Sequence, residues 1–339
     1  MLNMKLTIDI SKANASASPL VTPSGRFHLT REIGRGAEGR VYQASSISSC
    51  ECRVAVKVIS GSRNVCSDHY LPILQLVKHP NILRVVNVEE SERYTYIVTE
   101  LCDKDLFTFL TATPRGLLSE HHAAQLFGQL CRAIRFLHKS GVVHQDIKLE
   151  NLLIKNDQLK LGDLGSARFI EPVGPKFEES ISKSTSMRNG RTFIYLCPEL
   201  LTKYPNKLKC DGRQADIWAM GITLFVMVSG CLPWQEASPI DENFSMYASS
   251  GSLRKFLPQT VSGSLVNLLE GLLCINPLER LDSFDVLEHS WFSTFIYETS
   301  QGAPMSCKEH ETLSCGKKRS SCGVEGSLST KKHRSHDIQ

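Results

Sequence analysis

The first residues of this chain with a pattern suited to chemistry are Gly34, Gly36 and Gly39, spaced as G-x-G-x-x-G. Glycines let backbone amides approach phosphate oxygens because no Cβ atom stands in the way. A strand-like run follows them, which argues against a dinucleotide-binding fold and leaves a plain glycine-rich hairpin as the alternative. Lys57 ends the apolar run 54–57, where its ammonium group could meet a phosphate, although such a lysine is more often only an edge-strand residue.

A second group combines two carboxylates with an amide. Asp146 and Asn151 lie in one short polar segment, and Asp163 follows twelve residues after Asn151. On loops that flank short strands, these side chains could hold Mg²⁺ and accept the proton of a hydroxyl group. The glycines, the lysine and these three residues together suit the transfer of a phosphoryl group.

The order and spacing of these residues resemble the signature motifs of the eukaryotic serine/threonine protein kinases, and of their calmodulin-dependent-kinase-like branch. The resemblance covers about residues 28–292. It continues through Thr192–Glu199, which looks like the end of an activation segment, and through Asp216 and Arg280. It implies an α+β, bilobal protein kinase fold, with a small β-rich N-lobe (about 27–101) and a larger helical C-lobe (about 106–292).

The resemblance also implies an activity, which is transfer of the γ-phosphoryl group of ATP to serine or threonine hydroxyls of proteins. Asp146 would be the catalytic base, and Lys148 would neutralise the γ-phosphate. Asn151 and Asp163 would hold the metal ion, Mg²⁺ or alternatively Mn²⁺. The ATP-binding residues would be Gly34, Gly36, Gly39, Val41, Ala55, Lys57, Thr99, Glu100, Cys102, Asp105 and Leu153.

Other residues would support these groups. The resemblance implies a buried structural ion pair between Glu199 and Arg280 and a structural role for Asp216. Thr192 and Glu150 would belong to the platform that receives the protein substrate. Glu150, together with two nearby acidic residues, Asp103 and Asp105, stands where basophilic kinases bind arginines. This suggests a preference for Arg-x-x-Ser/Thr followed by an apolar residue, and solvated surface acids are the alternative.

One departure from the kinase pattern concerns the partner of Lys57. Tyr70 stands where a helix of the family supplies a glutamate, and Asp68 is the only acidic residue between Lys57 and Glu89. Asp68 would lie on another helix face, and Pro72 makes a regular helix there less favourable. The departure favours an alternative function, a pseudokinase scaffold with weak or no phosphotransfer, and it somewhat resembles the Tribbles pseudokinases.

The remaining departures concern neighbouring positions. Gln145 replaces the arginine that usually grips an activation-segment phosphate, which suggests that phosphorylation there is not the main switch. The serine-rich segment 180–186 is then either a solvated loop or a regulatory phosphosite. Leu164 and Cys197 also differ from the residues usual at these positions, but the changes in side-chain volume are small enough to be tolerated. Every group expected to touch phosphate, metal or the transferred proton is present, and this favours the enzyme over the scaffold.

The elements that position these residues follow from hydrophobic patterning. Short β-branched and aromatic runs between residues 27 and 104 predict strands, interrupted by one helix-like run with Ser67 as a candidate N-cap. Apolar residues at helical spacing predict a helix behind Ser119, and two short strands follow between residues 151 and 163. Residues 215–230 and 264–276 are long enough for buried helices. The predicted organisation is a disordered leader (1–26), a kinase domain (27–292) and a basic disordered tail (293–339).

Composition limits the remaining classes. The 339 residues are 41% hydrophobic and 22% charged, which is typical of a soluble globular protein and excludes collagen and coiled coils. No apolar run approaches the roughly 20 residues of a membrane-spanning helix, and no secretory signal is evident. The twelve cysteines are scattered without a C-x-x-C pair, which favours free thiols in a reducing compartment.

The charge is unevenly distributed along the chain. The net charge is +4, of which the tail from residue 299 carries +3, so we do not expect the nearly neutral body to bind nucleic acid. Residues 317–319 and 331–334 are basic clusters whose spacing fits a bipartite signal read by a nuclear import receptor. Solvated disorder without a targeting role is the alternative. The expected location is cytoplasmic, nuclear or both.

Overall fold

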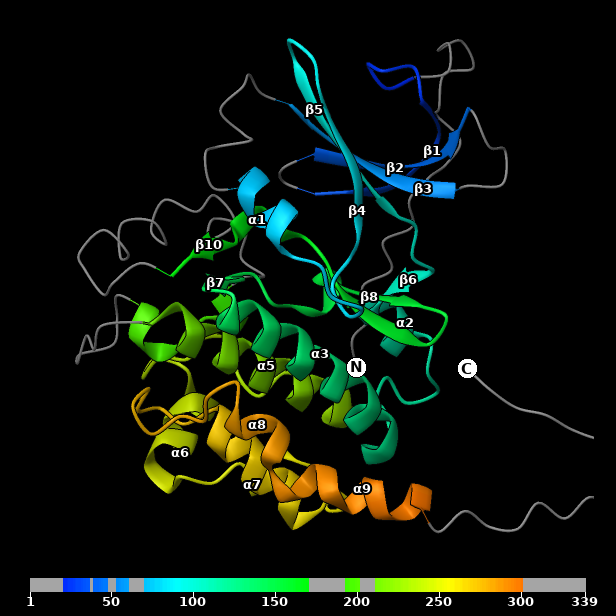
Figure 1. Cartoon of the computed structure of the whole chain (residues 1–339). Helices are drawn as coiled ribbons and strands as arrows, with labels where there is room; N and C mark the ends of the chain where they lie inside the picture. Colours follow the sequence, from blue (N-terminus) through cyan, green and yellow to red (C-terminus); the bar gives the residue numbers. More distant parts are fainter. Residues whose placement is uncertain are drawn as a thin grey trace, which may run out of the picture. The chain divides into compact units, whose positions relative to one another are not determined.

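The computed structural model describes residues 21–36, 39–47, 53–60, 70–170, 193–201 and 211–300, with side chains as far as Phe295. The described chain forms a β-rich N-lobe and a helical C-lobe, and Figure 1 shows the sheet of the first lobe above the helices of the second. This is the α+β bilobal architecture that the motifs predicted. None of the helices within the described part of the chain is long and apolar enough to cross a membrane.

The N-lobe is one antiparallel sheet with the strand order β1-β2-β3-β5-β4. Alternating apolar residues fix which face of each strand is buried. Phe27, Leu29, Val54, Val56 and Val98 form the small core on one face. The elements are β1 (Phe27–Arg35), β2 (Gly39–Ser46), β3 (Arg53–Ser60), α1 (Tyr70–Leu76), β4 (Val85–Glu90) and β5 (Tyr94–Glu100).

The C-lobe is built around two long helices, α3 (Glu120–Lys139) and α5 (Gly212–Ser229). Ser119 accepts a hydrogen bond from the His122 amide and so caps α3, as the sequence predicted. Fourteen of the eighteen residues of α5 are buried, which explains why its sequence is apolar all round. The other helices are α2 (Leu106–Thr111), α6 (Glu242–Ser250), α7 (Gly263–Leu272), α8 (Asp285–Glu288) and α9 (Ser290–Ser300).

Short strands and turns between these helices carry most of the candidate site. The strands are β6 (Lys104–Asp105), β7 (Val142–Val143), β8 (Leu152–Lys155), β9 (Gln158–Leu161) and β10 (Arg168–Phe169). Single 3-10 turns occur at η2 (Leu149–Asn151), η3 (Leu164–Ser166), η5 (Phe193–Tyr195), η6 (Pro198–Leu200) and η7 (Arg254–Phe256). Strands β6, β8 and β9 pair as one small sheet, and β7 pairs with β10.

The ordered fold begins earlier and ends later than the sequence predicted. Ser24 donates hydrogen bonds from its amide and hydroxyl to the Glu89 carboxylate, and Thr22 is buried. The prediction of a disordered leader is therefore wrong for residues 21–26, because a partner 65 residues away holds them. Helix α9 continues to Ser300, past the predicted boundary at residue 292.

The described part of helix α1 is Tyr70–Leu76, and its candidate cap, Ser67, lies outside the described residues. Pro72 lies within α1, so the proline does not prevent a helix from forming there.

Candidate active site

Four of the predicted ATP-binding residues lie on one face of the N-lobe sheet. Val41 is the register partner of Lys57, and Ala55 is the partner of Thr99. Residues opposite each other, or two apart on one strand, point to the same face. Val41, Ala55, Lys57 and Thr99 therefore form a single surface on β2, β3 and β5, and the glycine pattern stands at the β1–β2 end of that sheet.

The glycine pattern has one position where only glycine fits. A Cβ atom on Gly39 would overlap the carbonyl oxygen of Val58, whereas one on Gly36 would meet no atom of the described residues within 4 Å. Gly39 thus allows β2 to approach β3 closely. Gly34 lies in β1, and Gly36 donates its amide to the Gly39 carbonyl in the turn.

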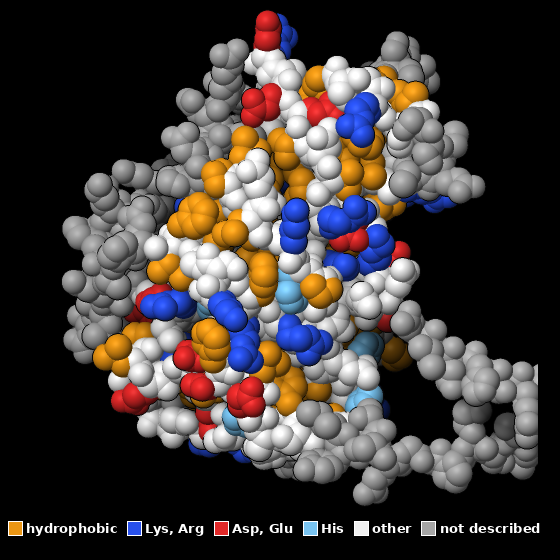
Figure 2. All heavy atoms as spheres, in the orientation of Figure 1, with side chains coloured by type: hydrophobic (Ala, Val, Ile, Leu, Met, Phe, Trp, Pro, Cys, Tyr) orange, Lys and Arg blue, Asp and Glu red, His pale blue; other side chains and the backbone are white. Residues whose placement is uncertain are grey.

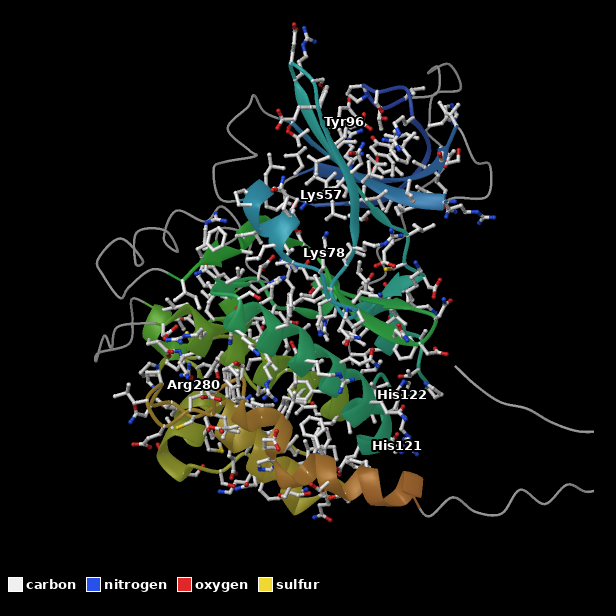
Figure 3. All side chains as sticks on the ribbon, in the orientation of Figure 1. Lys57, Lys78, Tyr96, His121, His122 and Arg280 are labelled. Carbon is white, nitrogen blue, oxygen red and sulfur yellow. The ribbon has the colours of Figure 1, made fainter. Side chains whose placement is uncertain are left out.

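Lys57 reaches from the N-lobe to Asp163 of the C-lobe. Figure 3 shows Lys57 at the lower edge of the sheet, near α1, and its Nζ lies 2.8 Å from Asp163 Oδ1. Burial by itself would raise the pKa of Asp163, but the Lys57 ammonium and its hydrogen bond outweigh that effect and hold the pKa below its usual value. Asp163 is therefore a carboxylate near neutral pH.

Asp146 is buried and surrounded by donors. Lys148 Nζ lies 2.8 Å from Asp146 Oδ1 and 2.7 Å from Oδ2. Asn151 Nδ2 donates to the Asp146 carbonyl and to Oδ2, both at 2.8 Å. These contacts fix the direction of the carboxylate, which a base needs in order to take a proton from a bound hydroxyl.

The segment before Asp146 is anchored by Asp216 of α5. The carboxylate of Asp216 accepts the amides of His144 and Gln145, each at 2.8 Å, and lies 3.0 Å from His138 Nε2. Gln145 has a φ of 65°, a strained value for a residue with a side chain. The two amide contacts hold this conformation and so place the next residue, Asp146.

The two predicted metal ligands are joined through Gly162. The Gly162 amide donates to the Asn151 carbonyl at 2.8 Å, and the Gly162 carbonyl lies 2.9 Å from His144 Nε2. Asp163 is the next residue, so the backbone of Gly162 connects the segments that carry Asn151 and Asp163. An amide oxygen and carboxylates are the ligands that Mg²⁺ uses beside nucleotide phosphates, and these residues fit such an ion.

Three of the predicted ATP-binding residues, Glu100, Cys102 and Asp105, lie in or beside the segment that connects the two lobes. The Glu100 carboxylate binds Lys155 Nζ at 2.8 Å and accepts the Arg84 amide at 2.9 Å, so its side chain stabilises the fold. Asp105 accepts both the amide and the hydroxyl of Thr108 and caps α2. Burial, followed by the nearby Glu100, raises the pKa of the Cys102 thiol to about 11.

Leu153 lies in β8, where Asp105 is its register partner, and its side chain is next to Gly162. Glu150 is exposed on η2. Thr192, the serines of 180–186, Asp68 and the basic tail lie outside the described residues. Of the predicted substrate platform, the described residues therefore include Glu150 but not Thr192.

Glu199 and Arg280 form a two-pronged ion pair. Arg280 Nη1 lies 2.7 Å from Glu199 Oε1, and Nη2 lies 3.1 Å from Oε2, with both side chains almost fully buried. Arg280 also donates to the carbonyls of Cys274 and Gln214. It thus joins the end of the activation segment to α5 and to the loop after α7.

Tyr70 is part of the main core rather than a polar partner on the surface. It is buried with Ile73, Ile82 and Ile97 in the cluster that runs through both lobes.

A residue that sequence reasoning missed is His138, which supports Asp216 from the last turn of α3. The only sequence signal for it was a histidine on the buried face of a predicted helix.

Comparisons with known proteins agree with this geometry. The sequence matches the protein kinase domain family over residues 27–292. It is 31% identical over 299 residues to CBL-interacting protein kinase 16 of Oryza sativa subsp. japonica, a match that covers 85% of this chain and 61% of that protein. It is 31% identical over 296 residues to CBL-interacting serine/threonine-protein kinase 12 of Arabidopsis thaliana, covering 85% and 57%.

The chain spans about half to three fifths of the length of these relatives. Within that span the matched region contains both lobes and every described residue of the candidate site. Family membership implies the use of ATP and a divalent metal ion. The chain therefore belongs to the protein kinase family, and its relatives include proteins named as serine/threonine kinases.

Proposed function

We propose that this chain transfers the γ-phosphoryl group of ATP to serine or threonine hydroxyls of proteins. The observation that carries the proposal is the cluster in which Lys148 and Asn151 bind the Asp146 carboxylate. Asp163 follows Gly162, whose amide binds the Asn151 carbonyl, and its carboxylate binds Lys57 of the other lobe. Phosphoryl transfer depends mainly on positioning and on stabilising negative charge, and this cluster supplies a base, two cations and oxygen ligands.

Each residue has one task in this reaction. Asp146 takes the proton of the substrate hydroxyl, Lys148 binds the transferred phosphoryl group, and Lys57 holds the remaining phosphates. Asn151 and Asp163 would hold Mg²⁺ or Mn²⁺, which would supply positive charge to the phosphates when bound. Lysine two positions after Asp146 resembles the serine/threonine branch of the family, which supports these hydroxyls as acceptors.

The test compares wild-type protein with Asp146→Asn in phosphate transfer from labelled ATP to a basic protein. Asp157→Asn, in the exposed turn between β8 and β9, makes the same chemical change away from the site. We expect activity in wild type and Asp157→Asn, and a loss of at least about 100-fold in Asp146→Asn. Absence of transfer by the wild type, even with Mn²⁺ and high ATP, would instead support the pseudokinase scaffold with Tyr70 at the glutamate position.

We also propose a basophilic substrate preference, supported by the exposed Glu150. The carboxylates of Asp103 and Asp105 already accept hydrogen bonds within the chain, Asp103 from the Asn156 amide and Asp105 from Thr108. Arrayed peptides should show selection for arginine before the phosphoacceptor, and Glu150→Gln should weaken it. A preference for acidic or proline-directed peptides would contradict the idea.

For localisation, we propose that the two basic clusters of the tail bind an import receptor and bring part of the protein into the nucleus. Deletion of residues 315–334 in a fluorescent fusion should reduce its nuclear fraction. An unchanged distribution would remove this proposal and leave the kinase proposal untouched.

A further inference from the structure

A group of basic side chains lies where the two lobes meet, on the surface drawn in Figures 2 and 3. Figure 2 shows lysine and arginine side chains gathered in the middle of this face, and Figure 3 labels Lys78 at the junction between α1 and the C-lobe. Five cations from the linker before β4, from α3 and from the β8–β9 hairpin make up this group, which we call the basic junction. They are Lys78, Arg84, Arg132, Lys155 and Lys160.

Hydrogen bonds, ion pairs and ring packing connect the segments that carry these residues. The Glu100 carboxylate accepts the Arg84 amide at 2.9 Å and lies 2.8 Å from Lys155 Nζ and 3.6 Å from Lys160 Nζ. The chain from Lys78 continues into His79, whose ring packs 5.1 Å from Phe136 of α3. Burial, then the charges of Arg132 and Lys160, lower the pKa of His79, which places those two cations around the ring.

The basic junction carries more positive charge than the described structure neutralises. Glu100 is buried and compensates Lys155 and Lys160 with a single negative charge. Lys78, Arg84 and Arg132 are exposed, and none of the carboxylates in the described ranges lies within ion-pair distance of them. Structural ion pairs therefore do not explain the three exposed cations.

We propose that the basic junction is a docking site for an acidic protein segment, rich in Asp and Glu, that contacts both lobes at once. The three exposed cations, Lys78, Arg84 and Arg132, are complementary in charge to carboxylates, and an arginine guanidinium can bind a carboxylate through two parallel hydrogen bonds. We assign the segment to a partner protein, since residues 299–339 carry a net charge of +3 and do not supply the excess of acidic residues that the site would select. The nearly neutral body gives no long-range field that would favour nucleic acid.

The test measures binding of a fluorescent peptide of about ten residues that alternates Glu and Gly, which spans about 33 Å when extended. The full chain is compared with Lys78→Glu/Arg132→Glu and with a control of equal charge change, Arg93→Glu/Lys255→Glu, at two exposed basic residues elsewhere. Reversal at the junction should weaken binding by about tenfold or more, and the control by less than about twofold. Wild-type affinity should fall as salt rises.

Several outcomes would overturn the proposal. These are equal losses in the two double variants, equal binding of a peptide with Gln in place of Glu, or tighter binding of single-stranded DNA of similar length at the same residues. Thermal unfolding shows whether the reversed variant is folded, and Lys78→Gln/Arg132→Gln replaces it if it is not. Because the readout is binding, a failure here does not bear on phosphotransfer.

Discussion

The ammonium nitrogen of Lys57 lies 2.8 Å from a carboxylate oxygen of Asp163, a residue 106 positions later in the chain and in the other lobe. The residue predicted to hold phosphate and the residue predicted to hold metal thus orient each other. The contact gives Lys57 a carboxylate neighbour although Tyr70 occupies the position of the expected glutamate. It also means that bound nucleotide and metal must share these two side chains.

Replacing Asp163 with Asn should abolish metal-dependent nucleotide binding. The change removes a metal ligand and the ion pair with Lys57 while leaving the shape nearly constant, and Asn tolerates the left-handed backbone of this position, where φ is 55°. Calorimetric titration of ATP with and without Mg²⁺ measures the effect. Asp157→Asn is the matched control, since its φ of 59° is similar and its side chain is exposed. Equal ATP affinity in both variants would contradict the role of Asp163.

Gly39→Ala should destabilise the N-lobe by about 1–3 kcal/mol, because the added Cβ atom would overlap the Val58 carbonyl and push β2 away from β3. Gly36→Ala should have a much smaller effect, because no atom in the described part of the chain lies within 4 Å of the added Cβ. Urea unfolding followed by circular dichroism compares the two. A loss of the same size at both positions would show that backbone freedom, and not the close approach of the strands, determines the result.

Glu199→Gln should lower the free energy of unfolding by about 3–5 kcal/mol, since it leaves the buried charge of Arg280 without its carboxylate. Glu288→Gln is the control. Glu288 lies 3.8 Å from Arg135 on the surface, and exposed pairs contribute little. The midpoint of thermal or urea unfolding reports both changes. Similar small shifts in the two variants would mean that the Arg280 contacts to backbone carbonyls suffice.

Alkylation of Cys102 should be slow at pH 8 and should accelerate as the pH rises toward 11. Burial raises the pKa of its thiol to about 11, so only about one molecule in a thousand is the reactive thiolate at pH 8. Peptide mass spectrometry after timed iodoacetamide treatment measures the rate, with the exposed Cys231 as the internal reference. ATP should slow the reaction of Cys102 further if the nucleotide binds beside it. A rate at Cys102 that matches Cys231 throughout would contradict its burial.

The candidate site was predictable from sequence because its residues fall in short segments with fixed spacing. Lys57 lies within strand β3, and Asp146 and Asp163 lie two or three residues after the short strands β7 and β9. Local patterning also located α3 with its cap at Ser119. The two buried helices were recognisable as apolar stretches of sufficient length, although α5 begins at Gly212, before the apolar run itself.

The sequence by itself determined the identity, order and spacing of the reacting groups, and the strands and helices whose periodicity is local. Only the tertiary structure decided which distant groups meet. Ser24 orders the chain before β1 through Glu89, His138 supports Asp216, and Glu100 turns its carboxylate to Lys155. The physical reason is that hydrogen bonds and ion pairs between such residues depend on how the lobes pack, and residue spacing along the chain carries no record of that packing.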